Sequence, residues 1–279
     1  MALRPIHAFD DHIRPAQLML KLYRLLDSEE PIVDRGDLVD RLRGLVRAGQ
    51  DEELLVVHHV MLTAVVRQRA DFRSADLKRA ALKSLLRQST VSACTALDAF
   101  LPALLRAHLP TILNRLGRRF FPSDTQVKEY FDGVSFGISD VLSFQERKPI
   151  EVAEAVANKM LGTTSFKYLS SSKGIHITGE LLQIRKPWDA LAAHLGQDSA
   201  SLKKTIDMTT RRRNDIVHRA DRSSDDPDSE AQQDVDPSQA RHGVDIINNV
   251  CHALDELVDK RINSLQQTTP DAATAEPPS

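Results

Sequence analysis

Apolar residues recur at helical spacing through the long segment 74–116, and this pattern constrains the fold most strongly. One stripe within "STVSACTALDAFLPALLRAHL" consists of Val91, Cys94, Leu97, Leu101 and Leu105. Residues three or four positions apart share one face of an α-helix, so the stripe predicts a helix that is buried on one side. Pro102 and Pro110 lie inside the segment, and each is expected to kink or restart the helix.

Composition also favours helices over sheets. Aromatic residues make up only 5% of the 279 residues and charged residues 27%, while Leu and Ala are abundant. A hydrophobic content of 41% is enough to build a core without disulfide staples. We therefore expect an all-α protein.

The first 72 residues are expected to form a separate N-terminal helical extension. A first helix is predicted from Pro15, placed in its opening turn, to about Asp27. A second is predicted over 36–48 and a third over 51–69, where acidic residues begin the segment and arginines end it.

Residues 73–264 are expected to form the main helical domain, followed by a disordered tail over 265–279. Further helices are predicted over "KPIEVAEAVANKML", over "DALAAHLG" with Gly196 as its stop, and over 239–264. Ser199 or Ser201 is expected to cap a helix that continues through an arginine cluster. The segment 162–180 is rich in Gly, Ser and Thr and is predicted to form a loop or short irregular elements.

Charge, cysteine usage and the lack of long apolar segments indicate what the protein can bind and where in the cell it is located. A net charge of -2 argues against a protein that coats nucleic acid through its overall charge, so any such contact must be local. Cys94 and Cys251 lack CxxC spacing and are expected to be buried and reduced. Because we find neither a leader-like apolar segment nor a run of about 18 apolar residues, we predict a cytoplasmic protein without membrane contact.

The segment "TTRRRNDIVHRADR", residues 209–222, gathers five arginines, one histidine and an Asn-Asp pair. Arg213 continues an apolar stripe begun by Leu202 and Ile206, and a guanidinium in that register must reach solvent or face a pocket or a partner. On a straight helix, side chains five positions apart, such as those of Arg213 and His218, differ in direction by about 140°. Both can serve one phosphate only if the helix deforms or if two copies pair across a two-fold axis.

These residue types suit RNA cleavage. RNA carries an internal nucleophile, the 2′-hydroxyl, so cleavage needs only a group that moves protons near pH 7 and a cation beside the phosphate oxygens. Histidine can do the first and arginine the second, without a metal or other cofactor. His58 and His59 lack the HExxH spacing of a metal site, so no metal is predicted there.

"RNDIVH", residues 213–218, resembles the R-x4-6-H signature of HEPN domains, and "RRRNDIVHRAD" is similar to the RiboL-PSP-type branch. The resemblance extends over roughly residues 79–262, from the helix around "VSACTALDAFL" to the closing helix. It implies an α-helical bundle that dimerises and joins two motifs in a shared cleft. It also implies a metal-independent endoribonuclease of toxin-antitoxin or antiphage defence systems, leaving a 2′,3′-cyclic phosphate and a 5′-hydroxyl.

The resemblance also implies roles for single residues. Arg213 would contact the scissile phosphate, His218 would transfer protons, and Asn214 would orient one or both. Asp98 would be an auxiliary acid, at a position where related sequences more often have Glu. Further RNA contacts are predicted for the flanking arginines Arg211, Arg212 and Arg219. The alternative for these arginines is a set of ordinary surface ion pairs, in which Asp215 joins Arg211 or Arg219.

Alternatives to a homodimeric endoribonuclease remain open. One is a catalytically silent HEPN module that binds RNA, nucleotide or a partner protein. Another is a subunit of a larger defence assembly, with an antitoxin or a sensor protein as partner. The acidic segment 221–236 is expected to be a solvated loop, and the alternative is that it folds over the arginines as a mimic of RNA.

Overall fold

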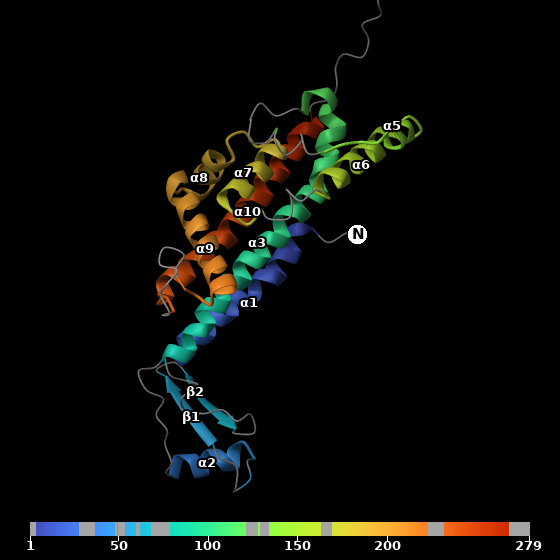
Figure 1. Cartoon of the computed structure of the whole chain (residues 1–279). Coiled ribbons are helices and arrows are strands. Elements are labelled where there is room, and N and C mark those ends of the chain that lie inside the picture. Colours follow the sequence, from blue (N-terminus) through green and yellow to red (C-terminus); the bar gives the residue numbers. More distant parts are fainter. Residues whose placement is uncertain are drawn as a thin grey trace, which may run out of the picture. The chain divides into compact units, whose positions relative to one another are not determined.

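The computed structural model describes residues 4–27, 37–47, 49, 54–59, 62–67, 79–120, 128, 134–162, 169–222 and 232–267. Helices dominate this part of the chain, which confirms the predicted all-α class (Figure 1). In chain order the elements are α1 (Pro5–Leu26), α2 (Asp37–Leu45), β1 (Leu54–His59), β2 (Leu62–Arg67), α3 (Arg79–Leu116), η3 (Gly117–Phe120), α5 (Ile138–Phe144), α6 (Pro149–Leu161), α7 (Ser172–Leu181), α8 (Pro187–Leu195), α9 (Ser199–Arg219) and α10 (Pro237–Gln267).

The chain divides into two compact units. Unit 1 consists of residues 1–13, 93–211 and 245–279, and unit 2 consists of residues 14–92 and 212–244. The long helices α1, α3, α9 and α10 each contribute to both units. The boundary predicted near residue 72 coincides with no limit of these units, so the predicted domain division stays a prediction.

The core of unit 1 is built on α3 and α10. Cys94, Leu97, Leu101 and Leu105 of the predicted stripe are buried on α3. The buried stripe of α10 consists of Val244, Ile247, Val250, Cys251, Leu254 and Val258, of which Val244 belongs to unit 2. Both cysteines are buried and free, as predicted, and burial raises the pKa of the Cys251 thiol. The helix α3 continues through Pro102 and Pro110, so neither proline restarts it, and the alternative, a kink, stays a prediction. Each proline removes one hydrogen bond, and the packed face on either side holds the helix together.

The first turns of α1 belong to unit 1. The helix begins at Pro5, so Pro15 lies inside it and not in its opening turn as predicted. Phe9 is buried against Phe100, with ring centroids 5.2 Å apart. Before the helix, the Arg4 guanidinium donates to the Asp255 carboxylate at 2.8 Å. Burial raises the pKa of Asp255, and the positive charge of Arg4 opposes that shift.

A helix, α7, occupies residues 172–180 of the loop predicted over 162–180. The side chain of Ser171 caps it by accepting a hydrogen bond from the Gly174 amide at 3.2 Å. Gly174 and Gly179 lie inside the helix, where they allow close approach of other backbone and of Pro187. The glycines that suggested a loop therefore serve packing, which is why composition misled the prediction.

Alanine at Gly174 should destabilise the protein by about 3 kcal/mol, at the upper end of what overpacking costs. A Cβ atom at this position would lie 1.9 Å from the carbonyl oxygen of Leu169, so the backbone must shift. Gly137→Ala is the matched control, because its Cβ would meet only side-chain atoms at 3.7 Å. Urea denaturation followed by circular dichroism measures both free energies of unfolding, and equal values for the two variants would contradict the close contact.

Unit 2 contains a β-hairpin where the third N-terminal helix was predicted. Strands β1 and β2 pair antiparallel, with Leu54 opposite Arg67 and His59 opposite Leu62. The predicted helix over 51–69 is therefore wrong, because "LLVVHH" and "LTAVVR" hold β-branched residues that fit a pleated strand better than a helix. The predicted second helix is confirmed as α2.

The remaining predicted helices are confirmed with small changes at their ends. Helices α6 and α8 lie where the patterns indicated, and Gly196 ends α8 in a left-handed conformation with φ 63°. Asp198 caps α9 in place of Ser199 or Ser201, since its carboxylate accepts from the Ser201 amide at 2.7 Å. The last helix extends to Gln267, so the predicted disordered tail is wrong for residues 265–267, and residues 268–279 lie outside the described part.

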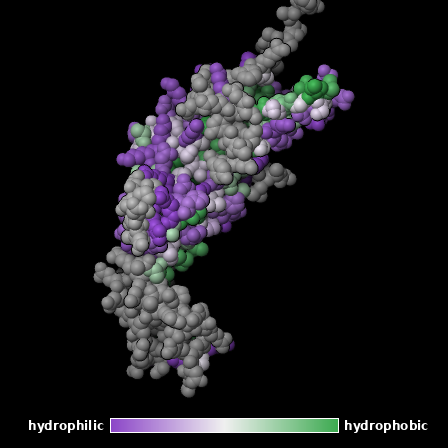
Figure 2. Space-filling view, in the orientation of Figure 1, coloured by the Kyte–Doolittle hydropathy of each residue, from purple (hydrophilic) through white to green (hydrophobic). Residues whose placement is uncertain are grey.

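Two surface properties bear on partners. By length and composition, α3 over Ala81–Leu116 could cross a membrane; a partly buried core helix passes the same test, so this is weak evidence. Helix α5 exposes Ile138, Val141 and Leu142, and Figure 2 shows this apolar surface. Exposed apolar surface of this kind commonly marks a contact with another segment or chain.

Candidate active site

The residues of the predicted motif lie near the end of α9. The helix continues unbroken to Arg219, with Leu202 and Ile206 buried as predicted. Arg213 is half-buried, and its Nη1 donates to Oδ1 of Asn214 at 2.9 Å. Asn214 and His218 are exposed. Because the α-helix is continuous here, a spacing of five positions places Arg213 and His218 about 140° apart around the helix axis.

Two other predicted site residues belong to unit 1. Asp98 is half-buried on α3, and Arg211 is exposed on α9. Arg213, Asn214 and His218 belong to unit 2, together with Arg219, which is half-buried. The auxiliary role of Asp98 and the RNA contacts of Arg211 and Arg219 stay predictions.

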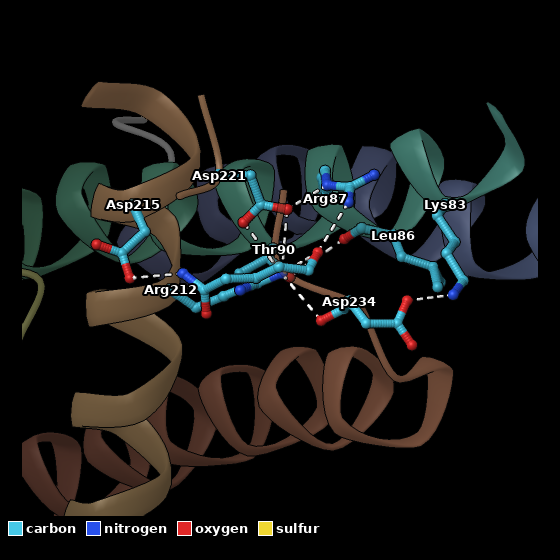
Figure 3. Close-up of polar contacts among 9 residues, drawn as sticks. Lys83, Leu86, Arg87, Thr90, Arg212, Asp215, Asp221 and Asp234 are labelled. Carbon is cyan, nitrogen blue, oxygen red and sulfur yellow. Dashed lines mark hydrogen bonds and ion pairs between the residues drawn. The ribbon is translucent and has the colours of Figure 1, made fainter. Parts of the chain in front are cut away.

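Arg212 is held in an internal network within unit 2 (Figure 3). Its Nη2 lies 3.0 Å from both carboxylate oxygens of Asp221, 3.2 Å from the Gln233 carbonyl oxygen and 3.1 Å from that of Asp234. The pKa of Arg212 is lowered by burial, and the negative charge of Asp221 opposes that shift. This arrangement favours a structural role for Arg212 over the predicted contact with RNA.

Asp221 is buried at the centre of this network. Its side chain is 2% exposed and accepts a hydrogen bond from Nε of Arg87, whose Nη2 also donates to the Gln233 carbonyl at 3.0 Å. The prediction placed Asp221 in a solvated loop and assigned nothing to Arg87. Arg87 and Asp221 are 134 positions apart, so no local sequence pattern could have paired them.

Asp215 is also buried, which corrects its predicted place in surface ion pairs. The Gln233 side chain donates to the Asp215 carboxylate at 3.3 Å. The backbone carbonyl of Asp215 accepts from the Asp221 amide at 2.9 Å. The helical spacing of Asp215 from Arg211 and Arg219 suggested an exposed charge. Its burial arises because the segment after the helix folds back against this side of α9.

Carboxylates in the described part of the acidic segment pair with cationic side chains of α3 and α9. Asp234 pairs with Lys83, and this hydrogen bond lowers the pKa of Asp234. Asp221 and Asp234 thus bind Arg87, Arg212 and Lys83, and residues 223–231 lie outside the described part. This is a structural clamp, and mimicry of RNA by the whole loop stays untested.

An imidazole can transfer protons near pH 7, and a guanidinium can stabilise negative charge. Within the described ranges, no cluster of three or more His, Cys, Asp and Glu residues could hold a metal ion. His58 and His59 lie on β1, in the hairpin.

Comparison of the chain with family models, with curated proteins and with solved structures gives no match. The likeness to HEPN domains therefore rests on the motif residues and on the order of the helices around them.

Proposed function

We propose that this chain is a metal-independent endoribonuclease of the HEPN type that acts as a homodimer in the cytoplasm. The observation that carries the proposal is the arrangement at the end of α9. Arg213 bonds to Asn214, and His218 is exposed one turn further on. The neighbouring charged side chains form internal contacts: Arg212 donates to Asp221, and Asp215 accepts from Gln233.

In the proposed reaction the 2′-hydroxyl oxygen attacks the adjacent phosphorus, and the bond from phosphorus to the 5′-oxygen breaks. His218 accepts the proton of the 2′-hydroxyl and passes it to the leaving 5′-oxygen, so the imidazole returns to its starting state. Arg213 stabilises the charge on the non-bridging oxygens, and Asn214 holds the guanidinium in place. The products are a 2′,3′-cyclic phosphate and a 5′-hydroxyl.

A second copy of the chain supplies what one helix lacks. Since α9 is one continuous α-helix through the motif, Arg213 and His218 of one chain point in different directions, whereas a two-fold axis can bring the Arg213 of one protomer to the His218 of the other. A role as a toxin or antiphage effector, with an antitoxin or a sensor as partner, belongs to the same proposal.

Incubating the purified full chain with total RNA in EDTA tests the proposal. We expect cleavage into fragments with 2′,3′-cyclic phosphate ends, and no cleavage of DNA of the same sequence, because DNA lacks the attacking hydroxyl. Cleavage that requires magnesium would contradict the mechanism. RNA binding without cleavage would support the alternative function, a silent HEPN module. That function does not require Arg213 and His218 to meet, so it is compatible with their divergence in a single chain.

A further inference from the structure

The chain reverses direction immediately after the motif in an unusual backbone conformation. Ala220 and Asp221 both adopt positive φ, 51° and 67°, which non-glycine residues rarely do. Each such residue costs of order 1 kcal/mol and persists only where the surroundings hold it. The Asp221 amide donates to the Asp215 carbonyl, and its own carbonyl accepts from the Gln233 amide at 2.8 Å. The reversal thus joins the last turn of α9 to residue 233.

Two arginines from different helices hold the Asp221 side chain in this reversal (Figure 3). Arg87 comes from α3 and Arg212 from α9, and the exposed fractions of their side chains are 16% and 21%. Both guanidiniums also donate to the Gln233 carbonyl. Charge-assisted hydrogen bonds of this kind are stronger than neutral ones, and the forked guanidinium fixes direction as well as distance.

We propose that Arg87, Asp221 and Arg212 form a positioning triad for the last turn of α9, the turn that carries His218. This inference rests on the proposed function of that turn. Asp221 follows His218 by three residues, and Arg212 immediately precedes Arg213, so the triad holds the motif at both ends. The three residues act through the helix and are positioning residues, not catalytic ones.

Positioning matters because the rate of a proton-transfer reaction falls steeply when the reacting groups are displaced. A displacement of about 1 Å at a reacting group can cost on the order of 100-fold in rate. A last helical turn frays easily, since its carbonyls lack partners within the helix. At the end of α9 the reversal ties this turn to α3 and to residues 233–234. The triad therefore keeps the His218 imidazole in one place at the point where a helix is least ordered.

Asp221→Asn tests the triad, with Asp234→Asn as the matched control. Asn keeps the shape of the side chain and removes its charge. The Asp234 side chain is 80% exposed, and its carboxylate pairs with Lys83 of α3, which is not one of the three triad residues. For Asp221→Asn we expect a fall of about 10- to 100-fold in kcat on RNA, with KM changed less than about twofold. Asp234→Asn should leave both near the wild-type values. Should Asp221→Asn fail to fold, Arg87→Lys replaces it, because Lys keeps the charge and loses the fork.

A second readout does not depend on cleavage. In protein labelled with ¹³C-histidine, the His218 resonance, assigned by its loss in His218→Ala, should shift or broaden in Asp221→Asn and stay unchanged in Asp234→Asn. A fall in kcat with an unchanged resonance, or a changed resonance with an unchanged kcat, would overturn the triad. If the wild-type chain cleaves no RNA, the proposed function fails, and the resonance alone decides whether the triad positions the turn.

Discussion

Replacing His218 by alanine should lower the rate of RNA cleavage by about 10²- to 10⁴-fold, the usual contribution of a positioned proton-transfer group. The side chain is exposed at the end of α9, so its loss should cost little stability and the effect should appear in the rate. His242→Ala is the control, since His242 is another exposed histidine in the same unit, on α10. Single-turnover cleavage of a short RNA in EDTA measures both variants.

Mixing two inactive variants tests whether the site is shared between protomers. If each site combines the Arg213 of one protomer with the His218 of the other, a dimer of Arg213→Ala and His218→Ala retains one intact site of its two. In an equal mixture that exchanges freely, about half the dimers are mixed, so about a quarter of the wild-type activity should return. No recovery in a demonstrably exchanged mixture would show that each site draws on a single chain. A loss of activity in His242→Ala equal to that in His218→Ala would contradict the assignment of His218 itself.

Prediction from sequence succeeded where a single helix face decides the structure. The stripe from Cys94 to Leu105 and the closing helix were identified because burial against one neighbour leaves a period of 3.6 residues. It failed at the hairpin over 54–67, where acidic and basic ends imitated a helix dipole while the β-branched residues favoured strands. It failed again at α7, because glycines that fit a crowded helix look the same in sequence as glycines of a loop.

The candidate site likewise has a part that the sequence could predict and a part that it could not. Arg213, Asn214 and His218 lie within six consecutive residues, so a short motif could suggest them as candidates and predict their divergence on the helix. The contacts that hold this turn were missed because Arg87 and Asp221 come together only in the folded chain. Asp215 and Asp221 looked like solvated charges, and their burial follows from the reversal at Ala220, for which local sequence carries no glycine signal.

Replacing Phe9 by alanine should destabilise the protein by about 3–5 kcal/mol, the usual cost of removing a large buried aromatic side chain. Phe9 is 1% exposed, and its ring packs against Phe100 and, at 6.0 Å between centroids, against His252. Phe144→Ala is the control, because Phe144 forms a similar pair with Phe136 at 5.7 Å but is only half-buried. Urea denaturation followed by circular dichroism should show a much larger loss for Phe9→Ala.

This experiment also decides what the first turns of α1 are for. If residues 1–72 were a detachable extension, loss of Phe9 would leave the unfolding of the remaining helices nearly unchanged. In the structure, Phe9 packs on α3 and α10, and Arg4 donates to Asp255 of α10, so the start of the chain completes the core of unit 1. Deleting residues 1–72 should therefore destabilise or unfold α3 and α10, which lose their contacts with Phe9 and Arg4. A truncated chain that keeps the helical content and the unfolding midpoint of the full chain would show that this core closes without α1.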